Sequence, residues 1–205
     1  TRSWCALNEE VRVEEINILK MAALGYQYGA IGMLTTNWGD YGNIASLSMA
    51  YYGLALGAAV SWNGATKADS AFRSAASMVL YGNGEMVDLA AKMGDTRDAA
   101  NWWKLVEGQG APVSEAVYAQ RIATCREIRE AIADLSFSND TIKREAISAA
   151  DGYALFAKWC ARLDGLDVAC SVDAPAWMEE YAALWRMRNK ESELGEVLRM
   201  FQTQE

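Results

Sequence analysis

The chain has 205 residues, with 27 acidic and 19 basic side chains and a formal net charge of −8 at pH 7. Nucleic acid and anionic membrane surfaces repel an acidic chain, so we expect neither as a partner. Because the sequence contains no histidine, Ser-His-Asp triads, Cys-His nucleophiles and histidine-based metal sites are excluded. Four scattered cysteines without a Cys-x-x-Cys spacing predict buried thiols, and we expect no metal and no cofactor.

The first third of the chain predicts alternating strands and helices. A strand is expected over 3–6 and a second one over 31–37. Between them, Asn8 predicts the N-cap of a helix that continues to about Gln27. The buried face of this helix is predicted to carry Val11, Ile16, Leu19, Ala23 and Tyr26. A strand, a helix and a strand with short connections predict a βαβ unit.

The remainder of the chain predicts helices alone. A helix over 46–62 is apolar on nearly every side, and its serines and glycines favour a core helix over a membrane span. Further helices are expected over 67–80, 85–93, 97–107, 114–135, 140–163 and 173–201. Short connections between long amphipathic helices predict an antiparallel bundle, so the chain is expected to be mainly α-helical.

Aromatic and acidic residues at helical spacing have simple structural interpretations. Large aromatic side chains at that spacing are predicted to be core residues; these are Trp102, Trp103, Trp159, Trp177 and Trp185. Adjacent helix residues point in different directions, so adjacent acidic pairs are interpreted as solvated surface. These pairs are Glu9-Glu10, Glu14-Glu15 and Glu179-Glu180.

The stretch Gly29–Asn43 suggests a ligand site. Trp38, Gly39 and Asp40 directly follow the predicted strand 31–37. Sugar rings lie against aromatic faces, and their hydroxyls donate hydrogen bonds to carboxylates, so this arrangement suits a carbohydrate. The alternative is a packed tryptophan beside a turn-forming aspartate.

Two stretches of this region resemble a known family. Leu-Thr-Thr-Asn-Trp-Gly-Asp-Tyr-Gly-Asn at 34–43 and the segment 51–63 are similar to the end of the catalytic barrel in family 20 glycoside hydrolases, the β-N-acetylhexosaminidases and their relatives. Thr1-Arg-Ser-Trp4 resembles the end of the preceding barrel strand. The segment 184–194 is similar to the closing helix of a helical domain in one branch of the family. The resemblance implies that 1–64 is the end of a (β/α)₈ barrel and that 65–205 is an α-helical C-terminal domain.

The resemblance also implies roles for individual residues. Trp38 would form a wall of the subsite for a terminal N-acetylhexosamine, and Asp40 would accept hydrogen bonds from its outer hydroxyls. Trp4 would line the same cleft or the next subsite, and Tyr41 would be a further substrate-binding residue. The family more often has a glutamate where Asp40 stands. Its catalytic Asp-Glu pair lies on an earlier strand, and no Asp-Glu dipeptide occurs in this chain, so we expect no catalytic residue here.

A complete (β/α)₈ barrel needs about 250 residues. We therefore expect this chain to be the C-terminal fragment of an exo-glycosidase that removes terminal β-linked N-acetylhexosamine. The fragment is expected to be inactive alone, and its expected partners are the glycan and the rest of the barrel. Unpaired strand edges predict that the isolated chain dimerises, exchanges elements or rearranges residues 1–45. The alternative is a non-catalytic helical interaction or assembly module, suggested by the acidic, aromatic-rich bundle.

Overall fold

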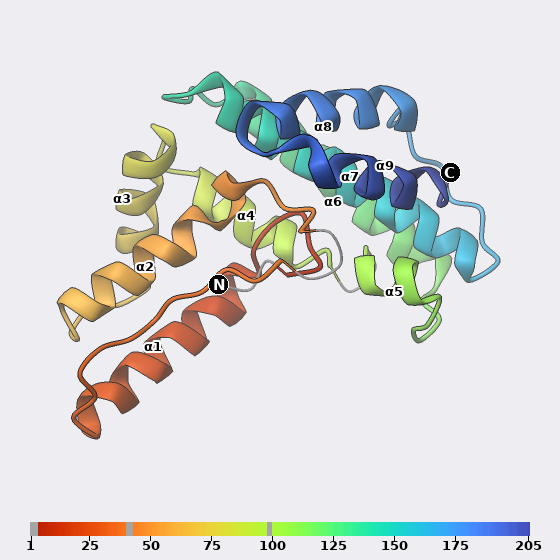
Figure 1. The fold of residues 1–205 in the computed structure, drawn as a ribbon. Coiled ribbons are helices and arrows are strands. Elements are labelled where there is room, and N and C mark those ends of the chain that lie inside the picture. The colour runs from red at the N-terminus through yellow and green to blue at the C-terminus, as the bar shows by residue number, and fades with distance from the viewer. Residues whose placement is uncertain (1–3, 40–42, 98–99) are drawn as a thin grey trace.

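The computed structural model describes residues 4–39, 43–97 and 100–205 (Figure 1). Within these ranges the chain is mainly α-helical, which confirms the predicted class. The helices are α1 (Val11–Gln27), α2 (Tyr51–Trp62), α3 (Ser70–Tyr81), α4 (Met86–Gly94), α5 (Trp102–Glu107), α6 (Glu115–Asp134), α7 (Asp140–Leu163), α8 (Ala174–Arg188) and α9 (Leu194–Gln202). Two 3₁₀ turns, Leu47–Ala50 and Glu191–Glu193, precede α2 and α9.

The predicted βαβ unit is not seen in the described ranges, where no residue belongs to a β-strand. Residues 31–37 are extended, but among residues 4–39, 43–97 and 100–205 no second strand lies beside them. Trp4 and Cys5 form a turn where the first strand was expected, and Ser3 lies outside the described residues. Figure 1 shows the extended segment running back along α1, with α2 following it.

Local capping explains where several helices begin and end. The side chain of Asn139 accepts a hydrogen bond from the backbone N–H of Thr141 at 2.8 Å, so α7 begins at the predicted residue. Asn101 caps α5 in the same way, and this helix is shorter than the predicted 97–107. The last predicted helix is interrupted because Asn189 is extended, which separates α8 from α9.

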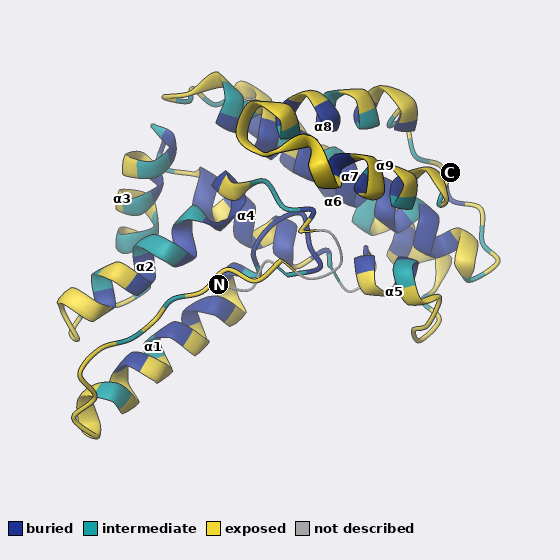
Figure 2. Cartoon of the chain, viewed as in Figure 1, coloured by how far each residue is buried: buried dark blue, intermediate teal, exposed yellow. Residues whose placement is uncertain are grey.

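The predicted buried face of α1 is confirmed at Val11, and Leu19 is half-buried, but the rest of it is wrong. Ile16 is 68% exposed and Tyr26 is 57% exposed, whereas Glu14 and Glu15 are buried on the side that packs against α2. The reason lies in distant partners: the Tyr52 hydroxyl donates to Glu15 at 2.6 Å, and Arg73 forms an ion pair with the same carboxylate. Figure 2 shows the resulting exposed side of α1 and of the extended segment.

Helix α7 lies at the centre of the core, and its central turns are almost wholly buried between α5, α6 and α8. An aromatic cluster fills it; the ring centroids of Trp177 and Phe201 lie 4.9 Å apart and those of Trp102 and Phe156 lie 5.1 Å apart. The core prediction is confirmed for Trp102, Trp159 and Trp177, while Trp185 is half-buried.

The residues that precede α1 also enter this core. Cys5, Ala6, Leu7 and Asn8 are buried, and the Asn8 side-chain amide donates to the carbonyl of Ala90 in α4 at 2.8 Å. The hydroxyl of Tyr153 in α7 accepts from the backbone N–H of Asn8 at 3.2 Å. Residues from both sides of position 64 therefore contribute to one hydrophobic core.

Candidate functional site

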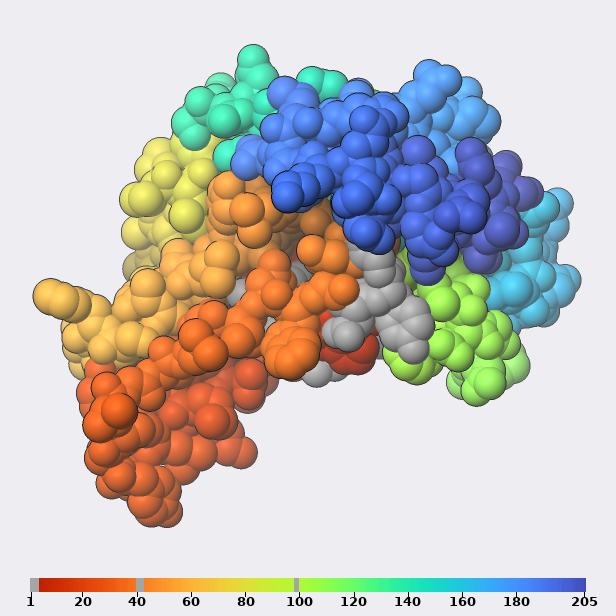
Figure 3. Space-filling model, viewed as in Figure 1, coloured from red at the N-terminus to blue at the C-terminus, as the bar shows by residue number. Residues whose placement is uncertain are grey.

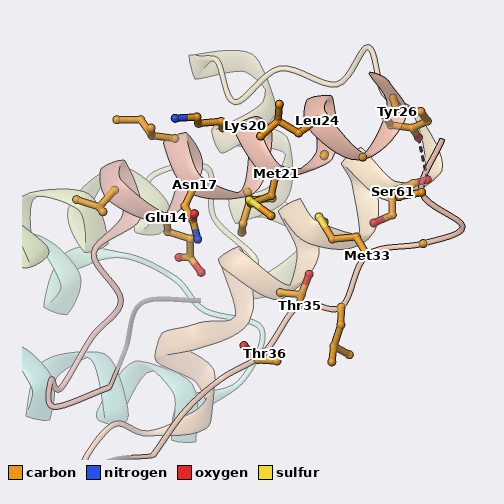
Figure 4. A pocket seen from close by; sticks show the side chains of 18 of the residues that line it. Glu14, Asn17, Lys20, Met21, Leu24, Tyr26, Met33, Thr35, Thr36 and Ser61 are labelled. Carbon is orange, nitrogen blue, oxygen red and sulfur yellow. Dashed lines mark hydrogen bonds between the residues drawn. The ribbon is translucent and has the colours of Figure 1, made fainter. Parts of the chain in front are cut away.

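The main candidate site is a cleft of about 1490 Å³ between α1 and the extended segment. Figure 3 shows this segment, in orange, lying beside α1, in red. In Figure 4, Glu14, Asn17 and Met21 project from α1, while Thr35 and Thr36 stand on the extended segment. Toward the end of α2, the Tyr26 hydroxyl donates to the carbonyl of Ser61 at 3.0 Å and joins α1 to α2.

Three tryptophans from distant parts of the sequence line this cleft: Trp4, Trp38 and Trp103. Trp38 is 64% exposed, and its indole N–H donates to the Thr36 hydroxyl at 2.9 Å, which orients the ring. The Arg97 guanidinium lies 5.6 Å from the centroid of the Trp4 ring and donates to the Trp4 carbonyl at 3.2 Å. Such stacking restrains the ring of Trp4.

The sequence-predicted site residues thus divide into two groups. Trp4 and Trp38 line the same cleft. Asp40 and Tyr41 lie outside the described residues.

Trp103 was interpreted as a core residue, and this was wrong, since it is 40% exposed and lines the cleft. Its neighbour Trp102 is buried. Adjacent helix positions point about 100° apart, so the sequence already indicated that the two rings do not share one environment.

A buried pair of carboxyl groups lies where α1 meets α2. Glu14 lines the cleft, and Glu9 lies next to it and accepts a hydrogen bond from the backbone N–H of Gly53 at 3.2 Å. Burial, followed by the charge and hydrogen bond of Glu14, raises the pKa of Glu9 well above its ordinary value. Burial also raises the pKa of Glu14. A carboxyl group that keeps its proton to higher pH can donate a hydrogen bond as well as accept one, so Glu14 adds both kinds of group to this end of the cleft.

The sequence interpretation of these acidic pairs as solvated surface was therefore wrong for Glu9, Glu14 and Glu15, all of which are buried. A signal was present in the spacing, because Glu14 falls three residues after Val11 and four before Ile18. Those spacings place the three side chains on one face of a helix. Glu179 is exposed and Glu180 is half-buried, where it forms an ion pair with Arg144 at 2.7 Å.

Glycines of α2 allow this close packing. A Cβ on Gly53 would lie 1.7 Å from a carboxylate oxygen of Glu14, and a Cβ on Gly57 would lie 2.2 Å from the Thr35 hydroxyl oxygen. Neither position tolerates a side chain without displacement of its neighbour. The two glycines therefore set how closely α1 and the extended segment approach α2.

Two other kinds of feature, a metal site and a membrane-spanning helix, are not found among the described residues. Over the ranges that the structure describes, no group of three or more cysteine, aspartate and glutamate side chains is arranged to hold a metal ion. No helix in those ranges is long and apolar enough to span a bilayer. Comparison of the chain with models of protein families, with curated proteins and with solved structures finds no match.

Proposed function

We propose that this chain is the C-terminal part of an exo-glycosidase that hydrolyses terminal β-linked N-acetylhexosamine, and that it supplies part of the sugar pocket. The observation that carries the proposal is that Trp4 and Trp38 line one cleft, with the Trp38 indole largely exposed. Aromatic faces of this kind bind the apolar faces of sugar rings. In this proposal Asp40 and Tyr41, which follow Trp38 directly, bind the hydroxyl groups.

The order and packing of the surrounding elements support the barrel part of the proposal. α1, the extended segment and α2 follow one another, and the segment contacts α2 at Gly57 while it runs back along α1. A slice of a (β/α)₈ barrel has this sequence of elements, with its strand packed on the flanking helices. We propose that the missing strands and the catalytic acid belong to a further part of the enzyme, and that 65–205 buttresses the barrel.

The carboxyl pair adds a polar component to the pocket. Because burial raises the pKa of Glu14, its protonated form persists to higher pH than that of an ordinary glutamate. A cleft that offers indole rings, a carboxyl group and the side-chain amide of Asn17 suits a neutral, hydroxyl-rich and amide-bearing ligand. N-acetylhexosamine has these groups.

A binding titration tests the pocket in the 205-residue chain. N-acetylglucosamine is added while amide and indole resonances are followed by nuclear magnetic resonance. We expect saturable shifts at Trp38 and their loss in Trp38→Ala. Trp62→Ala is the matched control, because Trp62 is 92% exposed at the end of α2 and does not line the cleft. No saturable shift in the unmodified chain, or equal loss in both variants, would refute the pocket.

A second experiment addresses the whole enzyme. In the parent protein, Asp40→Ala is expected to impair turnover of an aryl N-acetylglucosaminide, since hydrogen bonds to substrate hydroxyls are lost. Unchanged turnover would eliminate the role of Asp40.

The second candidate function is a non-catalytic helical interaction module. It is favoured by the exposed apolar side of α1, where Ile16, Met21 and Leu24 are accessible to solvent. A stable stoichiometric complex with another protein, together with no aminosugar binding, would favour this function over the glycosidase.

A further inference from the structure

The helical part of the chain contributes an aromatic ring to the cleft. Trp103 belongs to α5, within 65–205, and it lines the cleft together with Trp4 and Trp38 from 1–64. It is 40% exposed, so part of its indole is accessible to a ligand. The buttressing role proposed for 65–205 does not account for an accessible ring in the sugar cleft.

Trp103 stands on a firmly anchored helix. Its neighbour Trp102 is buried and stacks on Phe156 of α7, with the ring centroids 5.1 Å apart. The next residue, Lys104, is also buried, and its ammonium group donates to the carboxylate of Asp164 at 2.6 Å. Because both neighbours of Trp103 are fixed in the interior, the fold sets the position of the exposed ring. A ligand that contacts it therefore loses little affinity to the ordering of the protein.

The cleft has room and chemistry for more than one sugar ring. Its volume of about 1490 Å³ exceeds the range of about 300–1,000 Å³ that is usual for sites of drug-sized ligands. Trp4 and Trp38 supply the aromatic faces of the proposed pocket, so Trp103 offers a further face. Among the described residues that line the cleft, the acidic and basic side chains are Glu14 and Lys20, and this mostly neutral lining suits a neutral ligand.

We infer that Trp103 is a specificity-determining residue, which binds the second sugar of the glycan on the reducing side of the terminal N-acetylhexosamine. The inference rests on the proposed function, in which the terminal ring binds at Trp38. Indole is a large aromatic surface with a polar N–H at its edge, which suits the apolar face and the hydroxyl groups of a sugar ring. The helical part thus takes part in substrate selection, and it favours a terminal N-acetylhexosamine that is attached to a further neutral sugar.

Titration with one and with two sugar rings tests the inference. N-acetylglucosamine and its disaccharide N,N′-diacetylchitobiose are added separately to the 205-residue chain, and indole resonances are followed by nuclear magnetic resonance. We expect the disaccharide to bind at least about threefold more tightly, because its second ring removes further apolar area from water. Trp103→Ala is expected to abolish this preference and to leave the affinity for the monosaccharide unchanged.

Two other variants make the test specific. Trp103→Leu keeps an apolar side chain but lacks the flat aromatic face, and it is expected to lose the preference as Trp103→Ala does. Trp62→Ala is the matched control, because Trp62 is exposed and does not line the cleft, and it is expected to keep the full preference. The helical circular dichroism of each variant reports its folding.

Failure of the inference is distinguishable from failure of the proposed function. Equal affinity for the two saccharides in the unmodified chain would overturn the inference and leave the pocket at Trp38 intact. So would a folded Trp103→Leu variant that keeps the preference, or one that loses affinity for both saccharides equally. If neither saccharide binds, or if binding of the monosaccharide does not depend on Trp38, the proposed function fails and the inference fails with it.

Discussion

Substitution of Gly53 by alanine provides a sharp test of the packing between α1 and α2. In a helix interior, alanine is favoured over glycine by about 1 kcal/mol, so propensity alone predicts stabilisation. At this position, however, the new Cβ would lie 1.7 Å from one oxygen of Glu14 and 2.2 Å from its carboxyl carbon. The buried carboxyl group must therefore move, and overpacking of this kind costs about 3 kcal/mol at the upper end of its usual range.

The net expectation for Gly53→Ala is a loss of about 2 kcal/mol in the free energy of unfolding, which corresponds to a fall in Tm of about 4–8 °C for a chain of this size. Urea unfolding followed by far-ultraviolet circular dichroism measures it. The control is Gly195→Ala in α9, where a Cβ would meet no atom within 4 Å. We expect this variant to be unchanged or stabilised by up to about 1 kcal/mol. The reasoning fails if Gly53→Ala is as stable as the unmodified chain, or if both variants lose stability equally.

Three further predictions concern buried charges. Lys104→Met removes the cation 2.6 Å from Asp164 and is expected to cost about 3 kcal/mol in urea unfolding. Burial raises the pKa of Asp164, but the hydrogen bonds that it accepts, first that from Lys104, outweigh burial and lower the pKa. The ionised carboxylate therefore stabilises the fold above the ordinary aspartate pKa, and this stability is lost as the pH falls through the pKa of the folded state. Lys104→Met should therefore weaken this acid dependence, and an unchanged pH profile would contradict the assignment. Burial and the neighbouring Glu14 raise the pKa of Glu9, so the stability that its bound proton provides is lost as the pH rises through the pKa of the folded state. The substitution Glu9→Gln resembles the protonated form of this side chain. We expect the variant to gain stability near neutral pH and to differ little at about pH 4, measured by thermal unfolding; a loss at neutral pH would count against it. Arg188→Ala removes the cation 2.7 Å from the buried Glu145 and is expected to lower stability by about 3 kcal/mol near neutral pH and less in acid, because protonation then relieves the carboxylate. Equal losses at both pH values in denaturant titrations would refute this account.

The sequence predicted the helices well where local signals were sufficient. α7 begins at the predicted residue because Asn139 is a side-chain cap, and it ends at the predicted Leu163. In contrast, the interruption at Asn189 depends on a contact across the break, where the Trp185 indole donates to the carbonyl of Lys190 at 2.8 Å. Periodicity does not encode such a contact.

The candidate site was less predictable, because its polar groups depend on distant partners. Spacing indicates that Glu15 shares a helix with Val11. It does not indicate that an arginine from a later helix pairs with the charge of Glu15 and that a tyrosine donates a hydrogen bond to it, which together permit its burial. The apolar pattern of α1 likewise does not say which of its sides another element covers. Trp4 and Trp38 line one cleft, but their role in sugar binding stays a prediction that rests on the family resemblance.

The entry of residues 5–8 into the core has a consequence for dissecting this molecule. Leu7 lies so close to α7 that a Cβ on Gly152 would sit 2.4 Å from its side chain. A truncated chain that begins at residue 65 would therefore lack residues 5–8. Its core would have a void at their position, and it would lose the Asn8 groups that connect α4 to α7. Supplying the peptide of the first ten residues in trans should restore cooperative melting to the excised half.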